Sequence, residues 1–449
     1  MRTLFGTDGI RAVAGVDPLD TATIYAIGLA LAQTLGSSNP APRVLLGMDT
    51  RESGPWIAAT LAAGLVAGGA SVESSGIVTT PAVAYIAHTQ GFAAGVVISA
   101  SHNPWQDNGI KIFGADGYKL ADDVELAIER EIFHHRANST APDPAILTAP
   151  VVNPKFALDY LTFLHNVAPG LDLKGQKIVV DCANGAAYLL AQQLFATLGG
   201  DVRFTHAEPT GRNINENCGA LHAKVVAAET AAQSADIGIT FDGDADRCLL
   251  ADVRGNVVNG DAILLMAARD LANRGILTDS LVVATTMSNM GLEAALKRNG
   301  IRMLRAPVGD KYVLEQMQKH NAALGGEQSG HILLPHLATT GDGLLTALVI
   351  LDLVARTGKP IHELCADLKV YPQVIVNVRV REKLPLEDIP TVAAAIRAAE
   401  AELAETGRVV IRYSGTEPLA RVMIEAESEA TMRHHSEAIA SAIRAELGV

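Results

Sequence analysis

Short apolar runs recur along the chain, and each is followed by a polar loop and then by a stretch of helical character. A strand, a loop and a helix in this order open a βαβ unit. The runs lie at residues 44–46, 178–180 and 281–283. A second apolar run in each part ends in a loop rich in polar side chains: SASHNP, FDGDADR or GGEQSGH. The pattern therefore predicts three similar α/β domains, each contributing one such loop.

The C-terminal part of the chain follows a different order. We expect a strand at residues 374–378, a helix at 389–405, a strand-loop-strand at 408–426 and a final helix at 430–447. Strands that a short loop joins pair in antiparallel fashion, so this order is typical of a small α+β domain rather than a fourth copy.

Segments rich in proline or glycine mark the boundaries between these parts, because such residues interrupt regular structure. They lie near residues 142–154, 255–260 and 358–372. We therefore expect α/β domains at residues 1–150, 151–255 and 256–368, and the α+β domain at residues 369–449.

Composition narrows the class of protein. With 449 residues, 49% hydrophobic and 19% charged, the chain suits a large multidomain enzyme rather than a disordered protein. Its longest apolar stretches, such as residues 343–355, are too short to span a bilayer, and no apolar signal segment opens the sequence. We therefore expect a cytoplasmic protein without a membrane partner.

Cysteine spacing and charge exclude further classes. The four cysteines show no C-x-x-C spacing, so the sequence supports neither a disulfide framework nor a zinc site. The net charge of −13 argues against a nucleic-acid partner, because binding to a phosphate backbone needs clustered Lys and Arg. A small anion could still bind where cations gather locally.

Ser101 follows the predicted strand at residues 95–98, and Asn103-Pro104 breaks that strand immediately afterwards. Its hydroxyl therefore lies at the end of a strand, where α/β sheets place their ligands. The alternative is an ordinary turn whose geometry Asn and Pro supply. No G-x-S-x-G elbow surrounds Ser101, which argues against a serine hydrolase.

Asp242, Asp244 and Asp246 follow the predicted strand at residues 237–241. Alternate carboxylates on a loop at a strand's end suit a hard divalent cation. An EF-hand is excluded because Arg247 and Val253 occupy the positions that require glycine and glutamate. A solvated acidic turn is the alternative to a metal loop.

A loop in the C-terminal part of the chain carries candidate binding groups. Arg412, Ser414, Gly415, Thr416 and Arg421 combine guanidinium groups, hydroxyls and a glycine, which together suit a phosphate. A hairpin with charged flanks is the alternative reading.

The loop at residues 325–331 places Glu327, Ser329 and His331 where they could read sugar hydroxyls. Taken alone, this loop is more typical of a surface turn, and His331 could be an ordinary packed histidine. The segments at 6–11 and 309–311 are weaker signals.

Taken together, the loops resemble those of the α-D-phosphohexomutase superfamily, and the match runs in order over essentially the whole chain. The segments that carry the resemblance are FGTDGIRA, GMDTRESG, ISASHNPWQDNGIK, NINENCGALH, FDGDADR, TTMSNMGLE, GGEQSGH and RYSGTEPLARVMIE. Trp105-Gln106 is one small departure from the usual pattern, and it leaves the motif around Ser101 intact. The resemblance implies four domains around a central cleft.

The resemblance also implies a role for each candidate residue. Ser101 would carry a phosphoryl group, and Asp242, Asp244 and Asp246 would hold one Mg²⁺ against it. Glu327 and Ser329, with His331, would contact the sugar. The C-terminal Arg412, Ser414, Gly415, Thr416 and Arg421 would hold the phosphate that does not react. Lys111, Arg11 and Arg247 would be the catalytic cations.

Charge bookkeeping agrees with these roles. A phosphoserine adds about −1.5 to −2, which beside three carboxylates makes about −5, and one Mg²⁺ leaves about −3. Arg11, Lys111 and Arg247 could supply the remaining positive charge, which a loose phosphoryl-transfer transition state requires.

The resemblance implies an enzyme that interconverts the 6- and 1-phosphates of glucosamine through a 1,6-bisphosphate, which also serves as activator. Such an enzyme supplies amino-sugar nucleotide and cell-wall precursor synthesis. Gln328 favours glucosamine, since relatives acting on glucose or mannose commonly have methionine there.

Broad hexose specificity remains the nearest alternative. Two other classes stay open. One is a phosphatase in which Asp242 becomes phosphorylated, with Asp244 as its partner, and the other is a non-catalytic sugar-phosphate sensor. The sequence leaves a homodimer possible.

Overall fold

The computed structural model describes residues 3–6, 8–37, 39–138, 140, 142, 147–414 and 418–449. The chain folds as two compact units: residues 1–287 with 303–365, and residues 288–302 with 366–449. The first unit holds three sheets and the second holds one. Each unit is described below by itself.

The first sheet has the order β1 (Ile10–Val13), β5 (Asp107–Gly114), β4 (Ala94–Ile98), β2 (Arg43–Met48) and β3 (Ser71–Ile77). Strand β2 runs parallel to β3 and β4, whereas β5 runs antiparallel to β4 and β1. Its part of the chain also contains helices α1 (Thr21–Gly36), α2 (Gly54–Ala67), α3 (Thr80–Thr89) and α4 (Asp122–Asn138).

The second sheet has the order β10 (Val257–Val258), β9 (Cys248–Asp252), β8 (Ile237–Phe241), β6 (Lys177–Asp181) and β7 (Asp201–Thr205). Helices α5 (Lys155–Val167), α6 (Ala187–Ala196) and α7 (Lys224–Ala232) belong to this part of the chain. Because β10 pairs with β9, the second sheet extends two to three residues beyond the boundary expected at residue 255.

The third sheet has the order β12 (Arg302–Ala306), β11 (Leu281–Thr285), β13 (Leu324–Gly326) and β14 (Ile332–Leu333). Its helices are α8 (Gly260–Asn273), α10 (Asp310–His320), α11 (Gly343–Thr357) and α12 (Ile361–Leu364). Short 3₁₀ turns occur at Ala220–His222, Thr278–Ser280, Leu386–Asp388 and Ala404–Thr406.

The three sheets share one plan. In each, the strand that opens the βαβ unit runs parallel to a strand that ends in a polar loop, and an antiparallel strand follows that loop. Every residue of β4 and β8 is buried, as their unbroken apolar runs predict for central strands. The predicted repeat of three α/β domains is confirmed, and each repeat delivers its polar loop from a buried strand.

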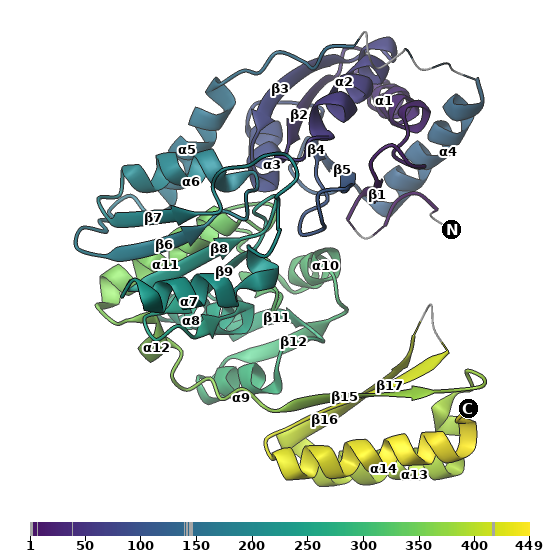
Figure 1. The fold of residues 1–449 in the computed structure, drawn as a ribbon, viewed down its shortest axis with the longest axis vertical. Helices are drawn as coiled ribbons and strands as arrows, with labels where there is room; N and C mark the ends of the chain where they lie inside the picture. The colour runs from purple at the N-terminus through teal and green to yellow at the C-terminus, as the bar shows by residue number, and fades with distance from the viewer. Residues whose placement is uncertain are drawn as a thin grey trace. The chain divides into compact units, whose positions relative to one another are not determined.

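The second unit is an antiparallel sheet with the order β15 (Gln373–Arg379), β17 (Leu419–Ala426) and β16 (Gly407–Tyr413). Helices α13 (Pro390–Leu403) and α14 (Glu429–Leu447) lie along one face of this sheet (Figure 1). Val422, Ile424, Ile439 and Ile443 are buried in the core between them. This is the predicted C-terminal α+β domain.

Helix α9 (Met290–Arg298) also belongs to the second unit, although it lies between β11 and β12 in the chain. The Met290 amide donates to the Glu425 carboxylate on β17, and the Asn289 side chain bonds the backbone of Tyr371.

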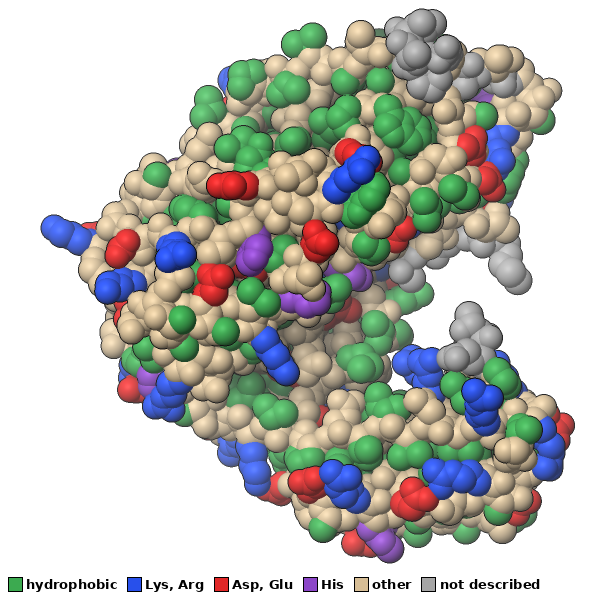
Figure 2. All heavy atoms as spheres, viewed as in Figure 1, with side chains coloured by type: hydrophobic (Ala, Val, Ile, Leu, Met, Phe, Trp, Pro, Cys, Tyr) green, Lys and Arg blue, Asp and Glu red, His purple; other side chains and the backbone are tan. Residues whose placement is uncertain are grey.

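Positive and negative side chains are interspersed on the face of the second unit that Figure 2 shows. None of the helices that the structure describes has the length and apolar character needed to cross a membrane.

Candidate active site

Ser101 lies in the loop between β4 and β5, with its side chain buried. Its φ of 51° is in the left-handed region, which costs a non-glycine residue about 1 kcal/mol. The Ser101 hydroxyl donates to Asp242 Oδ2 over 2.6 Å. The loop therefore is a turn, as the alternative reading held, but it is a turn that presents the hydroxyl to a carboxylate of the second domain.

Arg51 holds this loop in place, and sequence reasoning did not single it out. Its guanidinium is fully buried and donates to the backbone carbonyls of Ser101, Asn103 and Asp107 at 2.9 Å each, and also to that of Pro104. Asp49 accepts from Arg51 Nε at 2.9 Å and fixes the orientation of the guanidinium. The sequence signals for Arg51 were the pair of charged residues at the end of the apolar strand β2 and its place in the segment GMDTRESG, which carries part of the family resemblance.

The carboxylate loop follows β8. Asp242, Asp244 and Asp246 are all buried, and one oxygen of each lies within 4.8 Å of the others. Gly243 allows the loop to approach Ser101, because an added Cβ would lie 2.5 Å from the Ser101 carbonyl oxygen. The structure thus brings the predicted metal loop and the predicted phosphate carrier together.

The chemistry of this cluster fits a hard divalent cation. Burial raises the pKa of Asp242 well above its usual range, and the charges of Asp246 and Asp244 raise it further. Among the described residues, no donor bonds Asp244 Oδ1, although that oxygen is buried. Three crowded carboxylates with an unsatisfied oxygen are the donor set that Mg²⁺ prefers.

Lys111 on β5 is the buried cation of this cluster. Its ammonium lies 2.8 Å from Asp244 Oδ2, 2.9 Å from Asp8 Oδ2 and 3.4 Å from Asp246 Oδ2. Burial opposes the charge, but these three carboxylates keep the pKa of Lys111 well above its usual range. Lys111 is therefore protonated and placed among the carboxylates of the second domain.

Arg11 and Arg247 lie at the edges of the cluster. Arg11 pairs with Asp8, which also contacts Lys111. Arg247 Nε lies 3.9 Å from Asp246 Oδ1. Both predicted cations thus belong to the same constellation, joined through Asp8 and Asp246.

Thr80 is a further member that the sequence did not reveal. Its hydroxyl donates to Asp244 Oδ2 over 2.5 Å, and its amide donates to the Asp244 carbonyl. Thr80 begins α3 in the first domain and no motif marks it, so nothing along the sequence linked it to residue 244.

The predicted sugar loop follows β13. Glu327 accepts from the Gly309 amide at 3.0 Å and from the Ser329 hydroxyl at 3.2 Å, so its carboxylate has a fixed orientation. The Gln328 amide donates to Asp261 Oδ2 over 3.1 Å. Gly260 allows α8 to approach this loop, since an added Cβ would lie 2.0 Å from the Glu327 carbonyl oxygen.

His331 joins the sugar loop to the carboxylate loop. Its Nδ1 lies 3.6 Å from Asp246 Oδ1, and its Nε2 lies 3.5 Å from Asp310 Oδ2. Burial opposes protonation, but Asp246, Asp310 and Glu327 together raise the pKa of His331 to about 9. The imidazole is therefore a cation at neutral pH.

The predicted phosphate-binding residues belong to the second unit. Arg412 on β16 and Arg421 on β17 are direct cross-strand partners, which places two guanidinium groups on one face of the sheet. The Ser414 amide donates to the Leu419 carbonyl at 2.8 Å and closes the hairpin. Gly415 and Thr416 lie outside the described residues.

Comparisons with known proteins agree with this geometry. Profiles of the phosphoglucomutase/phosphomannomutase family match the chain in order: alpha/beta/alpha domain I at residues 2–139, domain II at 159–255, domain III at 259–371 and the C-terminal domain at 375–442. The chain is 58% identical over 458 aligned positions to a phosphoglucosamine mutase of Koribacter versatilis, covering 100% of this chain and 98% of the relative. A phosphoglucosamine mutase of Solibacter usitatus is 51% identical, covering 100% of this chain and 99% of that protein.

Solved structures show the same fold at lower identity. A phosphoglucomutase/phosphomannomutase family protein of Burkholderia thailandensis has a TM-score of 0.78 and 23% identity, covering 100% of both chains. N-acetylphosphoglucosamine mutase of Aspergillus fumigatus, in complex with GlcNAc-6P and magnesium, has a TM-score of 0.63 and 19% identity, covering 99% of this chain and 96% of that one. The order of the domain matches agrees with the resemblance of the loops to the α-D-phosphohexomutase superfamily. Four domain matches in order and a relative 58% identical over the whole chain show that the protein belongs to the phosphoglucomutase/phosphomannomutase family.

Proposed function

We propose that the protein is an isomerase that interconverts glucosamine 6-phosphate and glucosamine 1-phosphate, with Ser101 as the phosphate carrier. The observation that carries this proposal is the 2.6 Å hydrogen bond from the buried Ser101 hydroxyl to Asp242, within a cluster of three carboxylates and the Lys111 ammonium. The names of the curated relatives support glucosamine as the sugar. The product would feed amino-sugar nucleotide and cell-wall precursor synthesis.

The reaction needs two phosphoryl transfers. Phospho-Ser101 first gives its phosphoryl group to the C1 hydroxyl oxygen of glucosamine 6-phosphate. The bond between phosphorus and Ser101 Oγ breaks, and the hydroxyl proton passes to a nearby base. The bisphosphate then turns over and returns its 6-phosphoryl group to Ser101 Oγ. The bond between phosphorus and the C6 oxygen breaks, the serine hydroxyl gives up its proton and the C6 oxygen gains one, which leaves glucosamine 1-phosphate. A hexose 1,6-bisphosphate would therefore also prime an unphosphorylated protein.

Charge stabilisation is the main task of the surrounding residues, because a loose phosphoryl-transfer transition state demands little other chemistry. Asp242, Asp244 and Asp246, with the phosphoserine, would hold one Mg²⁺, which neutralises the charge on the phosphoryl oxygens. Lys111, Arg11 and Arg247 would contribute positive charge from other sides of the cluster.

Substrate binding would use two further sets of residues. Glu327, Ser329 and His331 would contact the sugar hydroxyls. Arg412, Ser414, Gly415, Thr416 and Arg421 would hold the phosphate that does not react. One such clamp can serve both half-reactions, because the bisphosphate has a phosphate at each end.

The organisation of the protein is part of the proposal. We place the phosphoserine, metal, sugar and phosphate functions in domains at residues 1–150, 151–255, 256–368 and 369–449. We also expect a cytoplasmic enzyme, which agrees with four cysteines that form no disulfide. A homodimer stays a prediction from the sequence.

Replacement of Ser101 by alanine tests the carrier role. Ser101→Ala removes the only atom that would carry the phosphoryl group, so we expect mutase turnover to fall by at least about 10³-fold. Conversion of glucosamine 6-phosphate is measured with Mg²⁺ and glucose 1,6-bisphosphate, and intact mass reports phosphorylation of the protein. Ser37→Ala, at the exposed end of α1, is the matched control.

Near-normal turnover of Ser101→Ala would refute the carrier role. A trapped phosphoprotein that hydroxylamine cleaves would instead indicate an acyl phosphate on Asp242. Comparison of kcat/KM for the 1-phosphates of glucosamine, glucose and mannose separates a glucosamine enzyme from one of broad hexose specificity.

A further inference from the structure

Six side chains, alternately acidic and basic, close a ring that shares Asp246 with the carboxylate cluster. Its members in order are Asp8, Lys111, Asp246, His331, Asp310 and Lys119, and we call this set the charge ring. The first domain supplies Asp8, Lys111 and Lys119, the second supplies Asp246, and the third supplies Asp310 and His331. The ring therefore ties together all three α/β domains of the first unit.

The contacts of Lys119 complete this ring. Its ammonium lies 2.6 Å from Asp8 Oδ1 and 2.5 Å from Asp310 Oδ2. Asp8 uses its other oxygen, Oδ2, to contact the Lys111 ammonium at 2.9 Å. Lys119 thus acts on Lys111 through a single intervening carboxylate.

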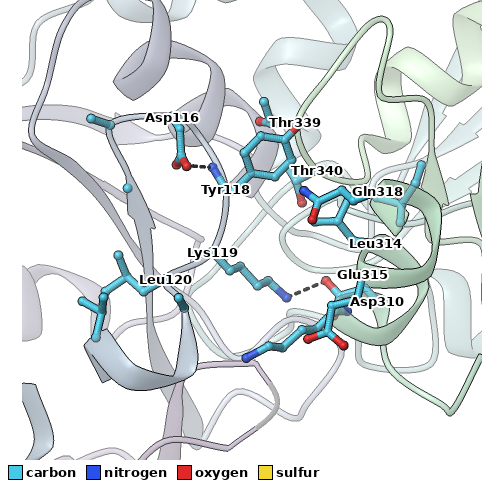
Figure 3. Close-up of a pocket in the computed structure, with 16 residues that line it drawn as sticks. Asp116, Tyr118, Lys119, Leu120, Asp310, Leu314, Glu315, Gln318, Thr339 and Thr340 are labelled. Carbon is cyan, nitrogen blue, oxygen red and sulfur yellow. Dashed lines mark hydrogen bonds and ion pairs between the residues drawn. The ribbon is translucent and has the colours of Figure 1, made fainter. Parts of the chain in front are cut away.

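Lys119 and Asp310 also face a cavity of about 610 Å³ lined by the segment after β5 and by α10. Figure 3 shows the Lys119 side chain extending across this cavity toward Asp310. The Lys119 side chain is only 18% exposed, and burial is offset by Asp310 and Asp8, so its pKa lies above its usual range. Lys119 is therefore a fixed positive charge held between two domains.

We propose that Lys119 and Asp310 are positioning residues that hold Asp8, and through it the Lys111 ammonium, beside the phosphoryl group on Ser101. This inference rests on the function proposed above and goes beyond it, because neither residue belongs to the constellation that would touch the phosphoryl group. Asp8 divides its two oxygens between Lys119 and Lys111, and the Lys111 ammonium is in turn shared between Asp8 at 2.9 Å and Asp244 at 2.8 Å.

Loss of Lys119 would change this balance in two ways. Among the residues that the structure describes, Asp8 would keep Arg11 and Lys111 as charged partners, and its stronger attraction would draw the Lys111 ammonium away from Asp244. The cluster would also lose one positive charge where the phosphoserine already adds negative charge. A small displacement of a catalytic group is sufficient to slow a reaction strongly.

The test compares wild type with Lys119→Met, Lys119→Arg and Asp310→Asn in the full chain. We expect Lys119→Met to lower kcat about tenfold while KM for glucosamine 6-phosphate stays within about twofold. The rate at which glucose 1,6-bisphosphate phosphorylates Ser101, followed by intact mass, should fall in parallel. Lys119→Arg keeps the charge and should recover most of kcat.

Arg212→Met is the matched control. Arg212 in the second domain pairs with Glu52 in the first at 2.6 Å and lies over the Trp105 ring at 4.9 Å, so this variant also removes one long cation and its contacts between domains. It lies outside the charge ring and should keep kcat within about twofold of wild type. Thermal melting of each variant shows whether it is folded at the assay temperature.

A double variant separates positioning from simple stabilisation. Because Lys119 and Asp310 act through the same link, Lys119→Met/Asp310→Asn should lose about as much kcat as the worse single variant. A kcat of Lys119→Met within about twofold of wild type, or a loss that Arg212→Met shares, would overturn the proposal. A kcat of Lys119→Arg that is no higher than that of Lys119→Met would also overturn it. Inactive wild-type protein would instead refute the proposed function.

Discussion

Ser101 differs from an ordinary turn serine in what its backbone carbonyl contacts. Arg51 and Asn215 both donate to this carbonyl at 2.9 Å, one from the first domain and one from the second. The Ser101 amide donates to the Ser99 hydroxyl, which in turn donates to Asp49. Together these bonds hold Ser101 in a backbone conformation that is unfavourable by itself, and so keep the Ser101 hydroxyl facing Asp242.

Replacement of Arg51 tests this account of the loop. Arg51→Met removes the bonds to four loop carbonyls and leaves Asp49 buried without its cation, so we expect a loss of about 3–5 kcal/mol in stability. Arg51→Lys retains the charge but lacks the planar fork, and should lose less stability while still lowering kcat. Urea unfolding midpoints and kcat are the measurements.

Arg136→Met, which removes a partly exposed pair with Asp17, should cost at most about 1 kcal/mol and serves as the control. If Arg51→Met were as stable and as active as this control, Arg51 would not be what holds the loop.

The N-terminal cap of helix α11 makes the stability of the protein depend on pH. Asp342 caps the N-terminus of this helix by accepting from the Leu345 amide, and it also accepts from the Tyr160 hydroxyl at 2.7 Å. Burial raises the pKa of Asp342 from its usual 3.8 to about 6, and these hydrogen bonds only partly oppose that shift. A folded-state pKa above the unfolded one means that ionisation disfavours the folded state.

The expected result is a stability difference that depends on pH. A pKa shift of roughly two units corresponds to about 3 kcal/mol of folding stability. This stability is lost as the pH rises from about 4 to about 6, where the unfolded state ionises before the folded one. Asparagine caps a helix equally well without a charge, so Asp342→Asn should be more stable than wild type above pH 7, and the difference should shrink toward pH 4. Urea unfolding midpoints of both proteins between pH 4 and pH 7 measure this stability difference.

Asp20→Asn provides a control of opposite sign. Asp20 caps α1; burial there is outweighed by hydrogen bonds from Thr23, which lower the pKa of the carboxyl. Its ionised form therefore favours folding above its usual pKa, and the stabilisation is lost as the pH falls. Asp20→Asn should thus give no gain at neutral pH. An equal gain in both variants would show that burial of Asp342 is not the cause.

The elements themselves were largely predictable from the sequence. Strands β4 and β8 carry unbroken apolar runs because both faces are covered, and the loops after them follow directly. Partners supplied by other domains were not predictable. Lys119 follows the turn after β5 and forms an isolated bridge with Phe113, and its contact with Asp310 spans 191 positions, so no local pattern encodes that contact. Helix α9 likewise bonds to the C-terminal sheet, although it lies between β11 and β12 in the chain.

At the scale of the whole molecule, the proposed chemistry is divided between two units. Ser101 and the carboxylate loop belong to the first unit, whereas the paired Arg412 and Arg421 belong to the second. Two guanidinium groups on one face of a sheet offer several donors to an anion with several oxygens, such as a phosphate.

Replacement of Arg421 tests this assignment. Arg421→Met removes one guanidinium of the clamp, so we expect KM for glucosamine 6-phosphate to rise about tenfold or more. Inorganic phosphate should raise the melting temperature of wild type more than that of the variant. Arg433→Met, which breaks an exposed pair with Glu429 on α14, is the control and should leave KM unchanged. An unchanged KM in Arg421→Met would show that this face of the sheet does not bind the substrate phosphate, and the clamp would then have to lie elsewhere.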